Sequence, residues 1–200
     1  VRTTLLRVAL ETGFHSLIEL LLRHEASQQV KNDLLRESAV HGPARVVELA
    51  LAHGAEVTSI PFLDVPLTGD RALVLSFIER GADPISDHPF ARAFHQLRAK
   101  TIVSSYMDCR RIRPNLAEGL QRQADMALRQ FAQDGNLKWV SLIMWAGADP
   151  RSSGPTVEDP DDSEWSTSAL HEACWSGNVG VLKRLQPPAP TTSRACFKGR

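Results

Sequence analysis

Glycines recur at a fixed spacing in this chain, and this repetition constrains the fold more than any other feature. Three pairs of glycines stand twelve residues apart: Gly42 and Gly54, Gly69 and Gly81, and Gly135 and Gly147. Two further stretches align on the first glycine of a pair, at Gly13 and Gly177, with Glu25 and Ala189 at the partner positions. Self-similarity at a fixed period indicates a fold built from repeated units.

Apolar residues keep constant distances from the first glycine of each stretch. Four, five and eight residues after it, on one face of a helix, stand Leu17, Ile18 and Leu21 in the first stretch and Val181, Leu182 and Leu185 in the last. Seven residues before it stand Leu6, Leu35, Phe62, Leu128 and Leu170. Each unit is therefore predicted to be a helix, a glycine turn and a second helix. One such pair is too thin to bury its own apolar face and must pack against another.

Two short motifs carry a family resemblance. Residues 168–178 read Ser-Ala-Leu-His-Glu-Ala-Cys-Trp-Ser-Gly-Asn, which resembles the ankyrin signature Thr-Pro-Leu-His-x-Ala-Ala-x-x-Gly-His/Asn. Residues 81–83 and 147–149 read Gly-Ala-Asp, which is similar to the end of an ankyrin repeat. The resemblance implies an all-α ankyrin-repeat solenoid of stacked helix-turn-helix pairs, with turn loops on one side. It also implies that the chain binds a protein partner.

The resemblance covers one predicted domain, residues 1–186, with units near 1–27, 31–57, 60–84, 87–110, 115–150 and 165–186. The third unit matches worst, because Pro61 and Pro66 interrupt its first helix. The fourth unit fills a gap of about twice the ~33-residue ankyrin period, and its turn is placed at Arg98. We therefore expect residues 61–109 to be a local weak point in stability.

Two segments fall outside the units. Residues 151–164 contain two prolines and five acidic side chains, so we expect an exposed loop. This loop is either an acidic arm that binds a basic partner or a tolerated insertion. Residues 187–200 begin with Pro-Pro-Ala-Pro, which cannot continue a helix, and are predicted to be a flexible tail.

Composition narrows the classes of function. Lys plus Arg and Asp plus Glu both number 23, so no net charge attracts nucleic acid, and none is expected as a partner. No apolar run approaches the roughly 20 residues that span a bilayer. Three widely spaced cysteines argue against a disulfide framework. We expect an intracellular, cytoplasmic and monomeric protein.

No motif predicts catalysis, a metal or a cofactor. The sequence lacks a Gly-rich phosphate loop, His-Glu-x-x-His and Gly-x-Ser-x-Gly. His171 and Cys174 share a helix face beside Glu172, but two candidate ligands do not complete a tetrahedral zinc site. In the ankyrin motif that this stretch resembles, the position of His171 is structural and Cys174 replaces a core alanine. We predict that the chain is not an enzyme.

The candidate partner-binding residues stand two and five positions before a turn glycine, where the resemblance implies variable side chains on a concave surface. They are Glu11, Glu37, Val40, Gln130, Gln133, Glu172 and Trp175. Trp145 joins them because an aromatic residue is out of pattern at its position; it either packs under the insertion or is exposed. Trp175 is the first candidate, since aromatic residues are enriched at binding hot spots. Alternatively, it packs against a seventh unit or the tail.

Two functions from different classes remain open. In the first, the chain is a protein–protein interaction module that binds through its concave face and inter-repeat loops. In the second, it is the targeting or regulatory ankyrin arm of a larger enzyme or toxin. A longer reading frame that carries a catalytic motif would favour the second.

Overall fold

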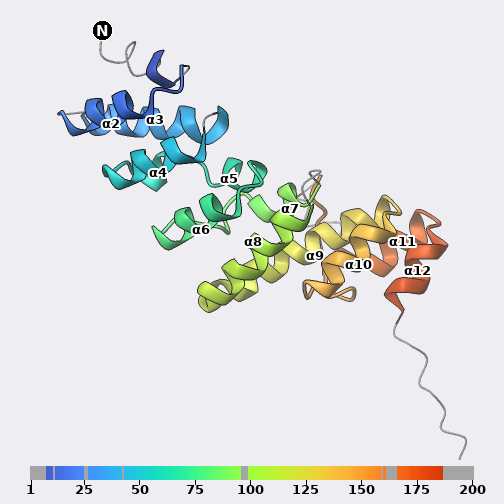
Figure 1. Ribbon diagram of the computed structural model, residues 1–200. Helices are drawn as coiled ribbons and strands as arrows, with labels where there is room; N and C mark the ends of the chain where they lie inside the picture. Colours follow the sequence, from blue (N-terminus) through green and yellow to red (C-terminus); the bar gives the residue numbers. More distant parts are fainter. Residues whose placement is uncertain are drawn as a thin grey trace, which may run out of the picture. The chain divides into compact units, whose positions relative to one another are not determined.

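The computed structural model of the chain describes residues 8–10, 12–24, 27–41, 43–95, 99–158, 160 and 166–186 (Figure 1). These residues are mostly helical with one small two-stranded sheet, which agrees with an all-α protein. They belong to two compact units, Val1–Ala127 and Leu128–Arg200. Within these described ranges, no helix has the length and apolar character needed to cross a membrane.

Unit 1 is a series of helices and short helical turns. They are α2 (His15–Arg23), α3 (Gln28–His41), α4 (Ala44–Ala52), η1 (Val57–Ser59), α5 (Asp64–Leu67), α6 (Arg71–Glu79), α7 (Pro89–Ala93), α8 (Ala99–Ile112), η2 (Pro114–Leu116) and the first part of α9 (Ala117–Gln133). The helices pack in succession, with α3 against α4, α5 against α7 and α6 against α8. The third predicted unit has a first helix of only four residues, α5, in agreement with its two prolines.

Among the described residues, unit 2 contains the end of α9, three further helices and a two-stranded sheet. Its elements are α10 (Leu137–Trp145), β1 (Ser153–Gly154), β2 (Thr167–Ser168), α11 (Ala169–Trp175) and α12 (Val179–Leu185). α11 packs against α12, and α12 packs against α10 (Figure 1). The last predicted unit is therefore a helix pair, α11 and α12, that contacts the preceding helix.

Glycines with positive φ separate successive helices, as the spacing predicts. Gly69 (φ 67°) lies between α5 and α6, Gly135 (φ 72°) between α9 and α10, and Gly177 (φ 69°) between α11 and α12. The turn at Gly42 lies outside the described residues, and so does the turn predicted at Arg98. Glycine adopts this backbone conformation without the steric cost that a Cβ atom imposes.

The repeated apolar positions supply the core. Five residues after the turn glycine, four side chains are fully buried: Ile18, Val47, Val74 and Val140. Seven residues before it, Leu35, Phe62 and Leu128 are buried, whereas Leu170 is only half-buried. The periodic positions therefore predict the buried face in most units and do so least well in the first, where Leu17 is 39% exposed and Leu21 is half-buried.

An aromatic cluster fills the core of unit 1 where the repeat pattern is weakest. The ring of Phe90 lies 6.2 Å from that of Phe62 and 5.6 Å from that of Tyr106, and both contacts are edge-on. Phe94 contacts the same tyrosine at 5.5 Å. Such contacts add to the stabilisation that comes from burying the rings.

A buried glutamine caps the short helix α7. The side-chain oxygen of Gln123, on α9, accepts hydrogen bonds from the backbone N–H groups of Phe90 (2.9 Å) and Ala91 (3.4 Å). Its amide nitrogen donates to the carbonyl of Pro84 at 2.7 Å. The residue before α7, His88, has left-handed backbone geometry and offers no side-chain cap. Gln123 therefore satisfies N–H groups that the first turn of a helix leaves unpaired.

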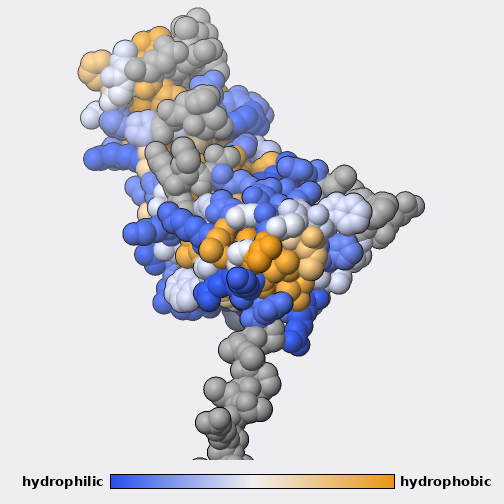
Figure 2. Space-filling view, turned by 90° about the vertical axis from the view of Figure 1, so that its right-hand side faces the viewer, coloured by the Kyte–Doolittle hydropathy of each residue, from blue (hydrophilic) through white to orange (hydrophobic). Residues whose placement is uncertain are grey.

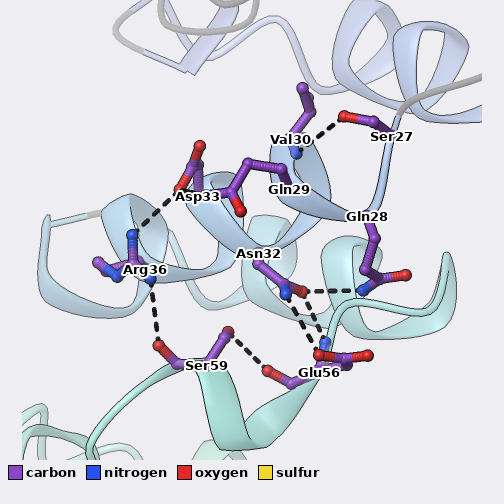
Figure 3. Close-up of polar contacts among 9 residues, drawn as sticks. All are labelled: Ser27, Gln28, Gln29, Val30, Asn32, Asp33, Arg36, Glu56 and Ser59. Atoms are coloured by element: carbon purple, nitrogen blue, oxygen red, sulfur yellow. Dashed lines mark hydrogen bonds and ion pairs between the residues drawn. The ribbon is translucent and has the colours of Figure 1, made fainter.

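Polar side chains of α3 hold the loop that follows α4 (Figure 3). The Asn32 side-chain oxygen accepts a hydrogen bond from the backbone N–H of Glu56 at 3.0 Å. One turn further along α3, Arg36 donates to the carbonyl of Ser59 at 3.3 Å. These contacts hold both ends of η1 against α3.

Asn178 ties the two helix pairs of unit 2 together at their turns. Its side-chain nitrogen donates to the carbonyls of Ala132 (3.0 Å) and Gln133 (2.8 Å), at the C-terminal end of α9. These carbonyls have no partner within a helix that ends here. A Cβ atom at Gly135 would lie 2.6 Å from the Asn178 side-chain oxygen, so the close approach requires glycine as well.

The insertion has a structured stem. β1 pairs antiparallel with β2, with Ser153 opposite Ser168 and Gly154 opposite Thr167. Arg129, buried in α9, donates to the carbonyls of Pro155 (2.7 Å) and Ser152 (3.1 Å). The prediction of an exposed loop from residue 151 is wrong for residues 154–157, which are half-buried because these contacts hold them. Residues 159 and 161–165 lie outside the described part of the chain.

Candidate protein-binding site

The helix α11 presents an exposed tryptophan on a well-anchored element. Ser168 caps the helix, since its hydroxyl oxygen accepts a hydrogen bond from the backbone N–H of His171 at 3.2 Å. Ala169 and Ala173 are buried and fix the inner side of the helix. On the outer side, Trp175 is 83% exposed.

The tryptophan is stacked on a histidine one helical turn earlier. The rings of His171 and Trp175 lie 6.4 Å apart with an angle of 13° between their planes. Residues at i and i+4 are neighbours on a helix surface, so the helix itself brings these two rings together. Cys174, which precedes Trp175 in the sequence, is also exposed. We name these three residues, His171, Cys174 and Trp175, the α11 face.

Exposure divides the predicted contact residues into three groups. Trp175, Trp145, Gln133 and Glu37 are exposed. Gln130 and Glu172 are buried, at 2% and 9% exposure, so their prediction as surface contacts is wrong. Glu11 and the side chain of Val40 lie outside what the structure describes.

The two buried residues face neighbouring parts of unit 2. The carboxylate of Glu172 accepts a hydrogen bond from the hydroxyl of Thr167 on β2, which places it under the stem of the insertion. The Gln130 side-chain nitrogen has long contacts to Gln133 (3.4 Å) and Asp134 (3.3 Å), and its oxygen is buried without a hydrogen-bond partner. A buried polar atom of this kind reduces stability and offers nothing to a partner.

His171 and Cys174 also differ from what the resemblance implies. The side chain of His171 is exposed, and Ser168 supplies the side-chain cap at the start of the helix. Cys174 is exposed too, so it does not replace a core alanine; Ala173 is the buried residue. In the part of the chain that the structure describes, no three His, Cys, Asp or Glu side chains are placed to hold a metal ion.

Comparisons with known proteins give no further evidence about this site. No family model matches the chain, and a search of curated proteins finds no match.

An apolar patch is exposed on the side of the molecule that carries α11 and α12. Figure 2 looks onto this side and shows the patch among hydrophilic residues. Val179, at the start of α12, is 59% exposed.

The sequence analysis identified Trp175 as a candidate contact but did not identify His171 as its neighbour. The i, i+4 spacing of the two residues on one helix could have predicted their contact.

Proposed function

We propose that this chain is a protein–protein interaction module of ankyrin-repeat type, which binds its partner through the α11 face. The observation that carries the proposal is the exposed indole of Trp175, stacked on His171. Tryptophan is among the residues most enriched at binding hot spots, where a few aromatic side chains supply most of the binding energy.

The helix–glycine–helix register supports the ankyrin type. Gly135 and Gly177 have nearly equal φ values, and each stands between two helices. Asn178, which follows Gly177, donates hydrogen bonds to the Ala132 and Gln133 carbonyls, which precede Gly135. This is the neighbour-to-neighbour contact expected between units of a repeat protein.

The anchoring of α11 supports binding without reorganisation. The helix is capped by Ser168, packed through Ala169 and Ala173, and connected to β2 through Glu172. Association costs less free energy when the contact residues are already held in place. An indole with two rotatable bonds, stacked on a neighbouring ring, loses little further freedom on binding.

The test compares partner capture by the intact chain and by Trp175→Ala, with the recovered proteins quantified by mass spectrometry. Loss of a central aromatic contact costs about 2 kcal/mol or more, so we expect the partner to be strongly depleted from the variant. Helicity and the unfolding midpoint should stay near those of the wild type, because the side chain is exposed. Equal recovery of the same proteins by both chains would refute the proposal.

Glu172→Ala is the contrasting variant. It removes the acceptor of the Thr167 hydroxyl and leaves a gap under the stem of the insertion. We expect it to lower the stability of unit 2, whereas Trp175→Ala should lower partner recovery alone. This contrast separates a damaged binding face from a damaged fold.

A further inference from the structure

A second surface of unit 2 is hollowed and carries both apolar and charged side chains. An open groove of about 670 Å³ lies between α10, the turn that follows it, and the end of α12. None of its lining residues belongs to the α11 face, so it constitutes a separate site.

The groove has an apolar lining centred on a tryptophan. Trp145, the last residue of α10, is 71% exposed and lines the groove together with Met144. Pro150 and Leu185 complete the apolar part. Buried Ala146 anchors the start of the turn that leads from α10 to Pro150. An exposed indole in a hollow with apolar neighbours is the kind of pocket that accepts one apolar side chain.

The charged residues of the groove are predominantly basic. Arg184 and Arg151 line it, and neither takes part in an ion pair among the described residues. The Nε atom of Arg184 donates to the hydroxyl of Ser141 at 3.0 Å, which extends the guanidinium from α12 toward α10. The one acidic residue of the lining, Asp149, accepts a hydrogen bond from the backbone N–H of Arg151 at 2.9 Å.

We propose that this groove binds an acidic peptide segment of a partner protein, with one apolar side chain against Trp145 and carboxylates on Arg184 and Arg151. Guanidinium groups bind carboxylates through paired, charge-assisted hydrogen bonds. The indole supplies the apolar contact that charge alone does not give.

Charge and anchoring bear on which segment can occupy the groove. The C-terminal residues 187–200 contain three basic residues, Arg194, Lys198 and Arg200, and no acidic one, so their charge does not complement that of the groove. The acidic insertion follows Arg151, but its stem is bonded to Arg129 on α9 and paired with β2. The charge of the groove and the anchoring of this stem together favour an acidic segment of a partner protein as the occupant.

The test uses calorimetric titration of the full chain with two acetylated peptides that differ only in charge. Both carry one central leucine, flanked by glutamates in the acidic peptide and by lysines in the basic one. We expect the acidic peptide to bind and the basic peptide not to bind. Affinity for the acidic peptide should fall as salt is added, because charge pairs at an exposed groove are screened.

Three variants locate the binding. Trp145→Ala and Arg184→Glu should each weaken binding of the acidic peptide at least about tenfold, which corresponds to 1.4 kcal/mol. Arg122→Glu, an equal charge reversal at an exposed position of α9, should leave it unchanged. Circular dichroism and the unfolding midpoint check that each variant is folded. Trp175→Ala should bind the acidic peptide as the wild type does, so this proposal and that for the α11 face succeed or fail separately.

Several results would overturn the proposal. Equal binding of both peptides, no binding of the acidic one, or undiminished binding by Trp145→Ala would each do so. Self-association of the wild type that Trp145→Ala abolishes would show that a second copy of the chain occupies the groove instead.

Discussion

The two cysteines that the structure describes lie in opposite environments. Cys109, on α8, is fully buried, and burial raises the pKa of its thiol to about 12. Cys174 is exposed on α11. Because the thiolate is the reactive form, we expect iodoacetamide at pH 8 to modify Cys174 in the folded protein and Cys109 only after unfolding. Peptide mass spectrometry measures both; rapid labelling of Cys109 in the folded chain would contradict its burial.

Tyr106 and Cys109 together predict sensitivity to alkali. Burial raises the pKa of Tyr106 to about 12, as it does for Cys109. Below their ordinary pKa values, both groups are protonated in the folded and the unfolded chain, so their titration does not change the free energy of unfolding there. Between those values and pH 12, the unfolded chain loses protons that the folded chain keeps, so the free energy of unfolding falls. Denaturation at pH 8 and pH 11 tests this, with Tyr106→Phe as the variant that should lose part of the dependence.

At the scale of helices and turns, Asn178 makes the most specific contact between neighbouring units. Asn178→Ala removes the donor to the Ala132 and Gln133 carbonyls. The Gly135 N–H still donates to the Ala132 carbonyl at 3.4 Å, and the bond to the Gln133 carbonyl is exposed to solvent. We therefore expect the loss of stability typical of an ordinary hydrogen bond, about 0.5 to 1.5 kcal/mol. Lys183→Ala, at an exposed position on α12, should change stability by less than about 0.5 kcal/mol. Equal stability of the two variants in chemical denaturation would show that the turn-to-turn contact contributes nothing.

Helix positions could be predicted from the sequence because glycine spacing and apolar periodicity are local signals. Ile18, Val47, Val74 and Val140 were assigned to the core by their distance from a glycine, and all four are buried. Glu172 and Gln130 were assigned to the surface by the same rule and are buried. For Glu172 the cause is non-local, since the hydroxyl of Thr167 reaches it from β2. No spacing along the helix reports that contact.

The candidate surfaces show the same limit. Trp175 and Trp145 were identified as aromatic residues outside the repeated apolar pattern, and both are exposed. The groove beside Trp145 depends on Arg184, more than thirty residues away along the chain, and on its bond to Ser141. Contacts between side chains of α10 and α12 are tertiary and cannot be predicted from local sequence patterns.

At the scale of the whole chain, the structure favours a different distribution of stability from the one expected for degenerate repeats. The sequence predicts a weak point at residues 61–109, yet Phe62, Phe90, Phe94 and Tyr106 are buried there in mutual contact. We expect slow amide hydrogen exchange in α8, slower than in the terminal helix α12. Phe90→Ala should destabilise the protein by about 3 to 5 kcal/mol. Faster exchange in α8 than in α12 would instead support the weak point.

Photo-crosslinking from Cys174 tests whether the α11 face contacts a protein partner. Cys174 lies beside Trp175, so benzophenone maleimide attached to it, in a Cys196→Ser background, samples this surface without replacing the indole. The matched control carries Cys174→Ser and Glu79→Cys, which moves the label to an exposed position on α6. We predict that irradiation with the partner recovered by the intact chain gives a covalent adduct from position 174 and little from position 79. Equal adduct from both positions, or none from position 174, would contradict the account.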